Sequence, residues 1–128
     1  MRIRSVKPEF LRHKGLQKLE RENPGQYVML TFEGLWLASD KQGVFAWDAD
    51  YLHLDILPFL AFDFEKTLAV LEAAGEIESF ESNGKTYGYI PSFPVHQRIS
   101  GEEAKASSRY PSPEKKQVGI RSAYEAAE

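Results

Sequence analysis

The side chains that could take part in catalysis are three histidines far apart in the sequence: His13, His53 and His96. None belongs to a His-x-His or His-Glu-x-x-His zinc motif, so surface or helix-capping roles are the more ordinary interpretation. The sequence has neither a Walker-type phosphate loop nor a Gly-x-Ser-x-Gly nucleophile motif. We therefore expect no enzymatic activity and no cofactor.

One group of aspartates suggests a cation site. Asp48, Asp50 and Asp55 are close in sequence, but their spacing is not that of a calcium-binding loop, and Asp48 suits a helix N-cap better. The chain has no cysteine, which excludes disulfides and thiolate zinc sites. We expect no metal site.

Positive charge is concentrated at the start of the chain, where it could bind the phosphates of a nucleic acid. Residues 1–25 carry seven Lys or Arg against three acids, residues 26–91 carry three against eleven, and residues 92–128 carry six against five. A basic arm attracts phosphate and an acidic core repels it. Alternatively, the same cations pair with the acidic core or are solvated. The cations concerned are Arg2, Arg4, Lys7, Arg12 and Lys14.

The clearest structural pattern is a helix beginning near residue 63. Asp63 can cap this helix, and Gly75 can end it. Phe64, Leu68 and Leu71 recur at helical spacing and are predicted to be its buried face.

A β-hairpin follows that helix. Strands are predicted at residues 77–81 and 86–90. Between them, Asn83-Gly84 fits a type I′ turn, which needs positive φ at both central residues.

An earlier helix is predicted from Asn23, which suits an N-cap, with Pro24 at the first helical position and Gln26 completing a capping box. It continues through residues 27–38, which are apolar nearly all round. A helix without a polar face belongs in the middle of a core. Residues 44–46 are then predicted to form a short strand.

Asp48 is expected to cap a second core helix, which Pro58 must end. Its buried face is predicted to be Tyr51, Leu52 and Ile56.

Helix, short strand, helix, helix and hairpin is the order of a winged helix. We therefore predict an α+β fold of the winged helix-turn-helix type. The predicted organisation is a basic N-terminal arm over residues 1–22, a winged-helix domain over residues 23–99 and a weakly structured tail over residues 100–128. No apolar run approaches the roughly 20 residues of a transmembrane helix, and the opening is not a signal peptide, so we expect a cytoplasmic protein that does not bind membranes.

Several short segments, together spanning about residues 2–113, match one family. They are Arg2-Ile3-Arg4-Ser5-Val6-Lys7-Pro8-Glu9-Phe10, Gly34-Leu35-Trp36, the turn from Asp40 to Val44, Leu71-Glu72-Ala73-Ala74-Gly75, and His96-Gln97-Arg98-Ile99 followed by Ser and Pro. Through them the chain resembles phage and prophage replication proteins of the replisome-organiser type, with a DnaD-like winged-helix N-terminal domain. The opening and the His96 segment are the most specific matches.

This resemblance implies binding of double-stranded DNA, self-association as a homo-oligomer, and handover to a helicase loader. Contacts with the DNA backbone position such a protein without specifying sequence. The residues expected to make them are Arg2, Arg4, Lys7, Arg12, Lys14, Lys66, Lys85 and Arg98.

The alternative hypothesis is a protein-interaction module on the same scaffold. Its acidic surface would dock on a basic host nucleic-acid-binding protein and act as an adaptor or inhibitor. Glu65, Glu72 and Glu76 would form the partner-binding surface. The two hypotheses differ in whether these glutamates share the face of the hairpin, because three acids there would oppose DNA binding by that face.

Overall fold

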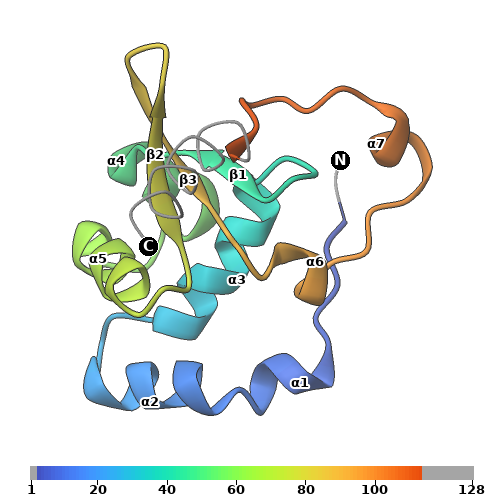
Figure 1. Ribbon diagram of the computed structural model, residues 1–128. Helices are drawn as coiled ribbons and strands as arrows, with labels where there is room; N and C mark the ends of the chain where they lie inside the picture. The colour runs from blue at the N-terminus through green and yellow to red at the C-terminus, as the bar shows by residue number, and fades with distance from the viewer. Residues whose placement is uncertain (1–2, 114–128) are drawn as a thin grey trace, which may run out of the picture.

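The computed structural model describes residues 3–113 as an α+β structure with seven helices and one antiparallel three-stranded sheet (Figure 1). In chain order, its elements are α1 (Pro8–Leu11), α2 (Lys14–Glu22), α3 (Val28–Ala38), β1 (Val44–Ala46), α4 (Ala49–Ile56), α5 (Phe64–Ala73), β2 (Glu78–Ser82), β3 (Lys85–Tyr89), α6 (Phe93–His96) and α7 (Gly101–Lys105). No helix in this part of the chain is both long and apolar enough to cross a membrane.

The sheet has the strand order β1-β3-β2, so the hairpin of β2 and β3 is extended at its β3 edge by β1. Phe45 of β1 lies opposite Gly88 of β3. Asn83 and Gly84 have φ angles of 53° and 77°, which confirms the predicted type I′ turn. The tip of the hairpin projects beyond the rest of the molecule (Figure 1).

Helix α5 has the predicted start, buried face and end. The Asp63 side chain accepts a hydrogen bond from the Lys66 backbone N–H at 3.1 Å. Gly75 follows the helix with a φ of 79°, where a residue with a Cβ is disfavoured. The predicted core residues of this helix are all buried: Phe64, Leu68 and Leu71.

The start of α3 differs from the prediction. Asn23 ends α2, and both its backbone N–H and its side-chain amide donate to the Leu19 carbonyl. Helix α3 begins at Val28, where the Glu20 carboxylate accepts hydrogen bonds from the first two N–H groups at 3.0 and 3.1 Å. A carboxylate of the preceding helix thus replaces the predicted capping box, and Tyr27, with a φ of 48°, turns the chain into α3.

The capping of α4 confirms the prediction, but its predicted buried face is only partly right. The Asp48 side chain accepts from the Tyr51 N–H at 3.1 Å. Leu52 is buried and Ile56 packs against the core, whereas Tyr51 is 63% exposed. Leu52 and Ile56 form a narrow i, i+4 stripe toward the core, and Tyr51 lies outside that stripe.

The core includes the N-terminal helices. Phe10 of α1 and Leu16 of α2 are buried with the side chains of α3. The Phe10 ring lies 4.9 Å from the Trp36 ring, edge on. Part of the segment predicted as an arm is therefore a layer of the folded structure.

The first part of the predicted C-terminal tail also contacts the body. Glu103 of α7 pairs with Arg4, and the Tyr110 backbone N–H donates to the Asp40 carboxylate at 3.0 Å. The remainder of the tail, residues 114–128, lies outside the described residues.

Candidate nucleic-acid interface

Arg4 was predicted to contact phosphate, but its guanidinium forms its hydrogen bonds within the protein. Its side chain is 3% exposed and forms two hydrogen bonds with the Glu103 carboxylate, at 2.6 and 2.8 Å. Its Nε and Nη2 atoms donate to the carbonyl oxygens of Trp36 and Ser39. These contacts use four of the five N–H donors of a guanidinium. The structure thus corrects the prediction for Arg4, which fastens the N-terminal segment to α3 and α7.

Two other predicted cations lie around α6. Lys7 is exposed, and its Nζ donates to the Val95 carbonyl of α6 at 2.7 Å. Arg98 is exposed two residues beyond the end of that helix. Arg2 lies outside the described residues.

Arg12 and Lys14 are exposed where α1 meets α2, and α2 adds two exposed cations that were not predicted from the sequence. Lys14, Lys18 and Arg21 recur at i, i+4 and i+7, so they share one side of the helix. Leu16, on a different side of the helix, is fully buried, so the side that carries the three cations faces solvent. We call Arg12, Lys14, Lys18 and Arg21 the basic stripe.

The acids of α2 neutralise this stripe only in part. Glu22 lies 3.8 Å from the Lys18 Nζ, an exposed i, i+4 pair of the kind that contributes little to stability. The Glu20 carboxylate is directed to the start of α3, where it caps the N–H groups of Val28 and Met29. The exposed surface of α2 therefore keeps a net positive charge.

Lys66 of α5 and Lys85 at the start of β3 are both exposed, as a DNA-contacting role requires. Acidic side chains adjoin them. Glu65 and Glu72 are exposed seven residues apart on α5, on one side of the helix. The Ser79 hydroxyl of β2 donates to the Glu72 carboxylate at 2.6 Å, so this side of α5 lies against the hairpin.

Glutamates thus share the face of the hairpin. Side chains two residues apart on a strand point to the same side, so Glu81 lies on the side of Ser79. Glu76 follows α5 and is half-buried. We call Glu65, Glu72 and Glu81 the glutamate face. Three carboxylates there would repel the phosphates that flank a DNA groove.

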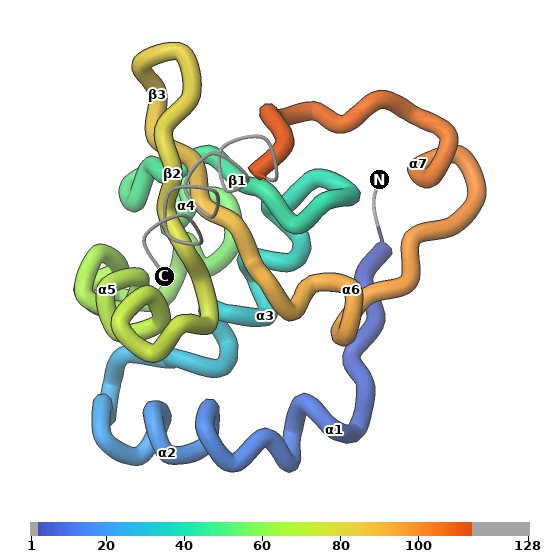
Figure 2. Tube along the Cα trace, in the orientation of Figure 1, coloured from blue at the N-terminus to red at the C-terminus, as the bar shows by residue number. Residues whose placement is uncertain are grey.

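The predicted cations do not converge on one surface. Helices α1 and α2 lie at one end of the molecule and the tip of the hairpin lies at the other, as the tube view shows (Figure 2). Helix α6 lies across the molecule from α5 (Figure 1). The basic stripe is therefore separate from Lys85, and a single duplex would meet these cations on different sides.

The two most specific segments of the family resemblance contact each other. The Gln97 side chain forms hydrogen bonds with both the N–H and the carbonyl of Ser5. His96 stacks on Trp36, with ring centroids 4.9 Å apart. Burial lowers the pKa of His96 below its usual value, and the nearby His13 and Lys7 lower it further. Both segments therefore serve the packing of this region.

Among the described residues, no three His, Asp or Glu side chains are grouped so that they could hold a metal ion. Hydrogen-bond donors and positive charge on the basic stripe are suited to phosphate groups, and the glutamate face is suited to cations. Comparison with known proteins finds no matching family model, no similar curated protein and no similar solved structure.

Proposed function

We propose that this protein is a winged-helix DNA-binding protein that acts in replication initiation, of the phage replisome-organiser type. The order α3, β1, α4, α5 and hairpin, with β1 paired to β3, supports the winged-helix assignment. The role in replication rests on the resemblance of the opening segment and of the His96 segment to that family.

In this proposal DNA binds at the basic stripe and not at α5. The observation that carries this choice is the i, i+4, i+7 spacing of Lys14, Lys18 and Arg21 on the solvent side of α2. Such a row of cations can follow a phosphate backbone, which gives affinity without sequence preference. The glutamate face keeps α5 away from the duplex.

The test is the triple variant Lys14→Gln, Lys18→Gln and Arg21→Gln. Its affinity for two unrelated duplexes should fall to the same degree, and the slope of log affinity against log salt should decrease by about 0.9 for each phosphate that the protein no longer neutralises. A second triple variant, with Lys66, Lys85 and Lys105 changed to Gln, removes the same charge elsewhere and should leave binding nearly unchanged. If the second triple variant lost more affinity for DNA than the first, the DNA site would instead be assigned to α5 and the hairpin.

A second candidate function is favoured by the 2.6 Å contact between Ser79 and Glu72, which places the glutamate face beside the hairpin. A protein-interaction module would use this face to bind a basic protein. Reversing Glu65, Glu72 and Glu76 to Lys distinguishes the two functions. Under the DNA proposal the reversal leaves duplex binding unchanged or stronger. Loss of a specific basic partner, with no duplex binding by either form, would support the second function.

A further inference from the structure

Helix α4 presents apolar side chains to solvent. Tyr51 is 63% exposed and Leu54 is 70% exposed, and these residues stand at i and i+3 on the same side of the helix. Phe59, in the connector between α4 and α5, is 97% exposed. Large apolar side chains gathered on one surface often mark a binding site, whereas scattered ones do not. We call Tyr51, Leu54 and Phe59 the α4 face.

The connector that carries Phe59 is held against α4. The His53 Nε2 lies 2.6 Å from the Leu60 carbonyl oxygen, within hydrogen-bond distance. The His53 ring also stacks on Phe64, with centroids 5.2 Å apart. Phe59 is therefore displayed from an anchored turn, so less conformational entropy is lost when a partner binds there.

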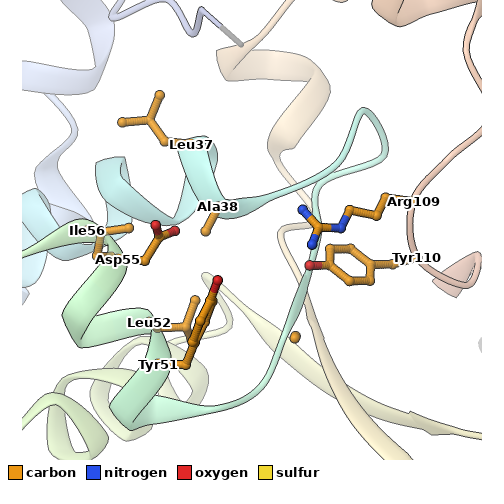
Figure 3. Close-up of a pocket in the computed structure, with 9 residues that line it drawn as sticks. Leu37, Ala38, Tyr51, Leu52, Asp55, Ile56, Arg109 and Tyr110 are labelled. Carbon is orange, nitrogen blue, oxygen red and sulfur yellow. The ribbon is translucent and has the colours of Figure 1, made fainter. Parts of the chain in front are cut away.

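A cavity of about 440 Å³ adjoins the α4 face. Leu37, Tyr51 and Ile56 form apolar walls of this cavity, which has room for a large side chain (Figure 3). Asp55 and Arg109 line it from opposite sides. The Arg109 guanidinium lies 5.2 Å from the centre of the Tyr110 ring. The α4 side of the cavity thus combines apolar walls with a carboxylate.

The charge carried by α4 and its connector is negative, and the cation Arg109 lines the cavity only on the side opposite α4. The sequence contains no Lys or Arg between Lys41 and Lys66. Asp50 and Asp55 of α4 are both exposed beside the apolar side chains. A partner that covers this surface must therefore bring apolar side chains together with cations, since another acidic surface would be repelled.

We propose that the α4 face and its cavity bind a basic amphipathic helix of a partner protein. An apolar side chain of that helix would fill the cavity, and its Lys or Arg side chains would pair with Asp50 and Asp55. This is the helix-in-groove mode of recognition. The site shares no residue with the basic stripe or the glutamate face, so it extends the proposed function to a protein partner.

The proposal can be tested with a labelled Leu/Lys peptide of about four helical turns, designed as an amphipathic helix. Fluorescence anisotropy with the full chain should show saturable binding. Leu54→Ser and Phe59→Ser should each weaken it by about 10-fold or more, the loss typical of an interface anchor. Asp50→Asn with Asp55→Asn should weaken binding and reduce its salt dependence. Because these four side chains are exposed, the variants should unfold at the wild-type denaturant concentration.

Two controls separate this site from general attraction to an acidic protein. A scrambled peptide of identical composition should bind far more weakly. The variant Glu65→Gln with Glu72→Gln removes the same charge from the glutamate face and should bind as the wild type does. The proposal would be overturned if the scrambled peptide bound equally well, or if the α4-face variants bound the peptide as the wild type does. It would also be overturned if the protein formed a dimer that Leu54→Ser dissociates, because the α4 face would then bind a second copy of the chain.

Discussion

The side-chain amide of Gln97 forms a complete pair of hydrogen bonds with the backbone of Ser5. The Ser5 N–H donates to the Gln97 Oε1 at 2.7 Å, and the Gln97 Nε2 donates to the Ser5 carbonyl at 2.8 Å. One buried side chain thus satisfies both polar groups of a residue in the N-terminal segment, as a neighbouring strand would. Together with the Arg4–Glu103 pair, it joins the start of the described chain to α6 and α7.

Replacing Gln97 by Glu should destabilise the fold. The change removes the Nε2 donor, so a carboxylate oxygen of the buried residue 97 faces the Ser5 carbonyl oxygen and neither acceptor has a donor. We expect the free energy of unfolding to fall by about 1–3 kcal/mol. Urea titration of the variant measures this loss. The control is Gln17→Glu, because the wild-type Gln17 amide donates to the Leu11 carbonyl in an exposed hydrogen bond. A Gln97 variant as stable as this control would contradict the role assigned to the pair.

Gly88 is predicted to tolerate no larger residue. Phe45 of β1 is the residue paired with Gly88, and its ring lies over the Gly88 backbone. A Cβ added at Gly88 would lie 2.1 Å from that ring. Gly88→Ala should therefore cost about 1–3 kcal/mol, as overpacking usually does. Phe45→Leu in the same chain should recover part of that loss, because the shorter side chain leaves room. Thr86→Ala, at an exposed position of the same strand, is the control for thermal unfolding.

Leu71 tests the placement of α5 in the core. It is fully buried, so Leu71→Ala should cost about 2–5 kcal/mol. Leu54→Ala removes the same atoms from a side chain that is 70% exposed and should cost far less. A denaturant midpoint for Leu71→Ala close to that of Leu54→Ala would show that α5 packs through a different face.

Elements whose signals are local were predictable from the sequence. Asp63 caps α5 by accepting a hydrogen bond from Lys66, only three residues further along the chain. The positive φ angles of the hairpin turn are those of Asn83 and Gly84 themselves. The start of α3 was not predictable in this way, because its cap is the Glu20 carboxylate of another helix. Local composition favoured Asn23, but the folded chain supplied a better-placed acceptor.

The candidate site shows the same division. Glu65 and Glu72 were named from the sequence as part of a possible partner-binding surface, and the structure shows both exposed on α5. The basic stripe could have been found by applying helical spacing to residues 14–22. The burial of Arg4 could not, since its partner Glu103 lies 99 residues away in the sequence. Charge counts along a chain do not reveal which cations form ion pairs with residues distant in the sequence.

His96 should make stability depend on pH. Its ring is buried against Trp36 and Phe10, and this burial lowers its pKa below 6.5; Lys7 and His13 act in the same direction. The unfolded chain therefore takes up a proton at a higher pH than the folded chain does. Stability from this group is fully present above about pH 7 and is lost as the pH falls from 6.5 through the folded pKa.

The matched variant is His96→Phe, which keeps an aromatic ring in the cluster and removes the titration. Between about pH 7.5 and pH 5, the wild type should lose more stability than this variant, because acidic groups titrate equally in both. Urea midpoints measured at several pH values give the comparison. If the two proteins lose the same stability over this range, the imidazole takes up its proton as readily when folded, and the burial of His96 does not disfavour its charged form.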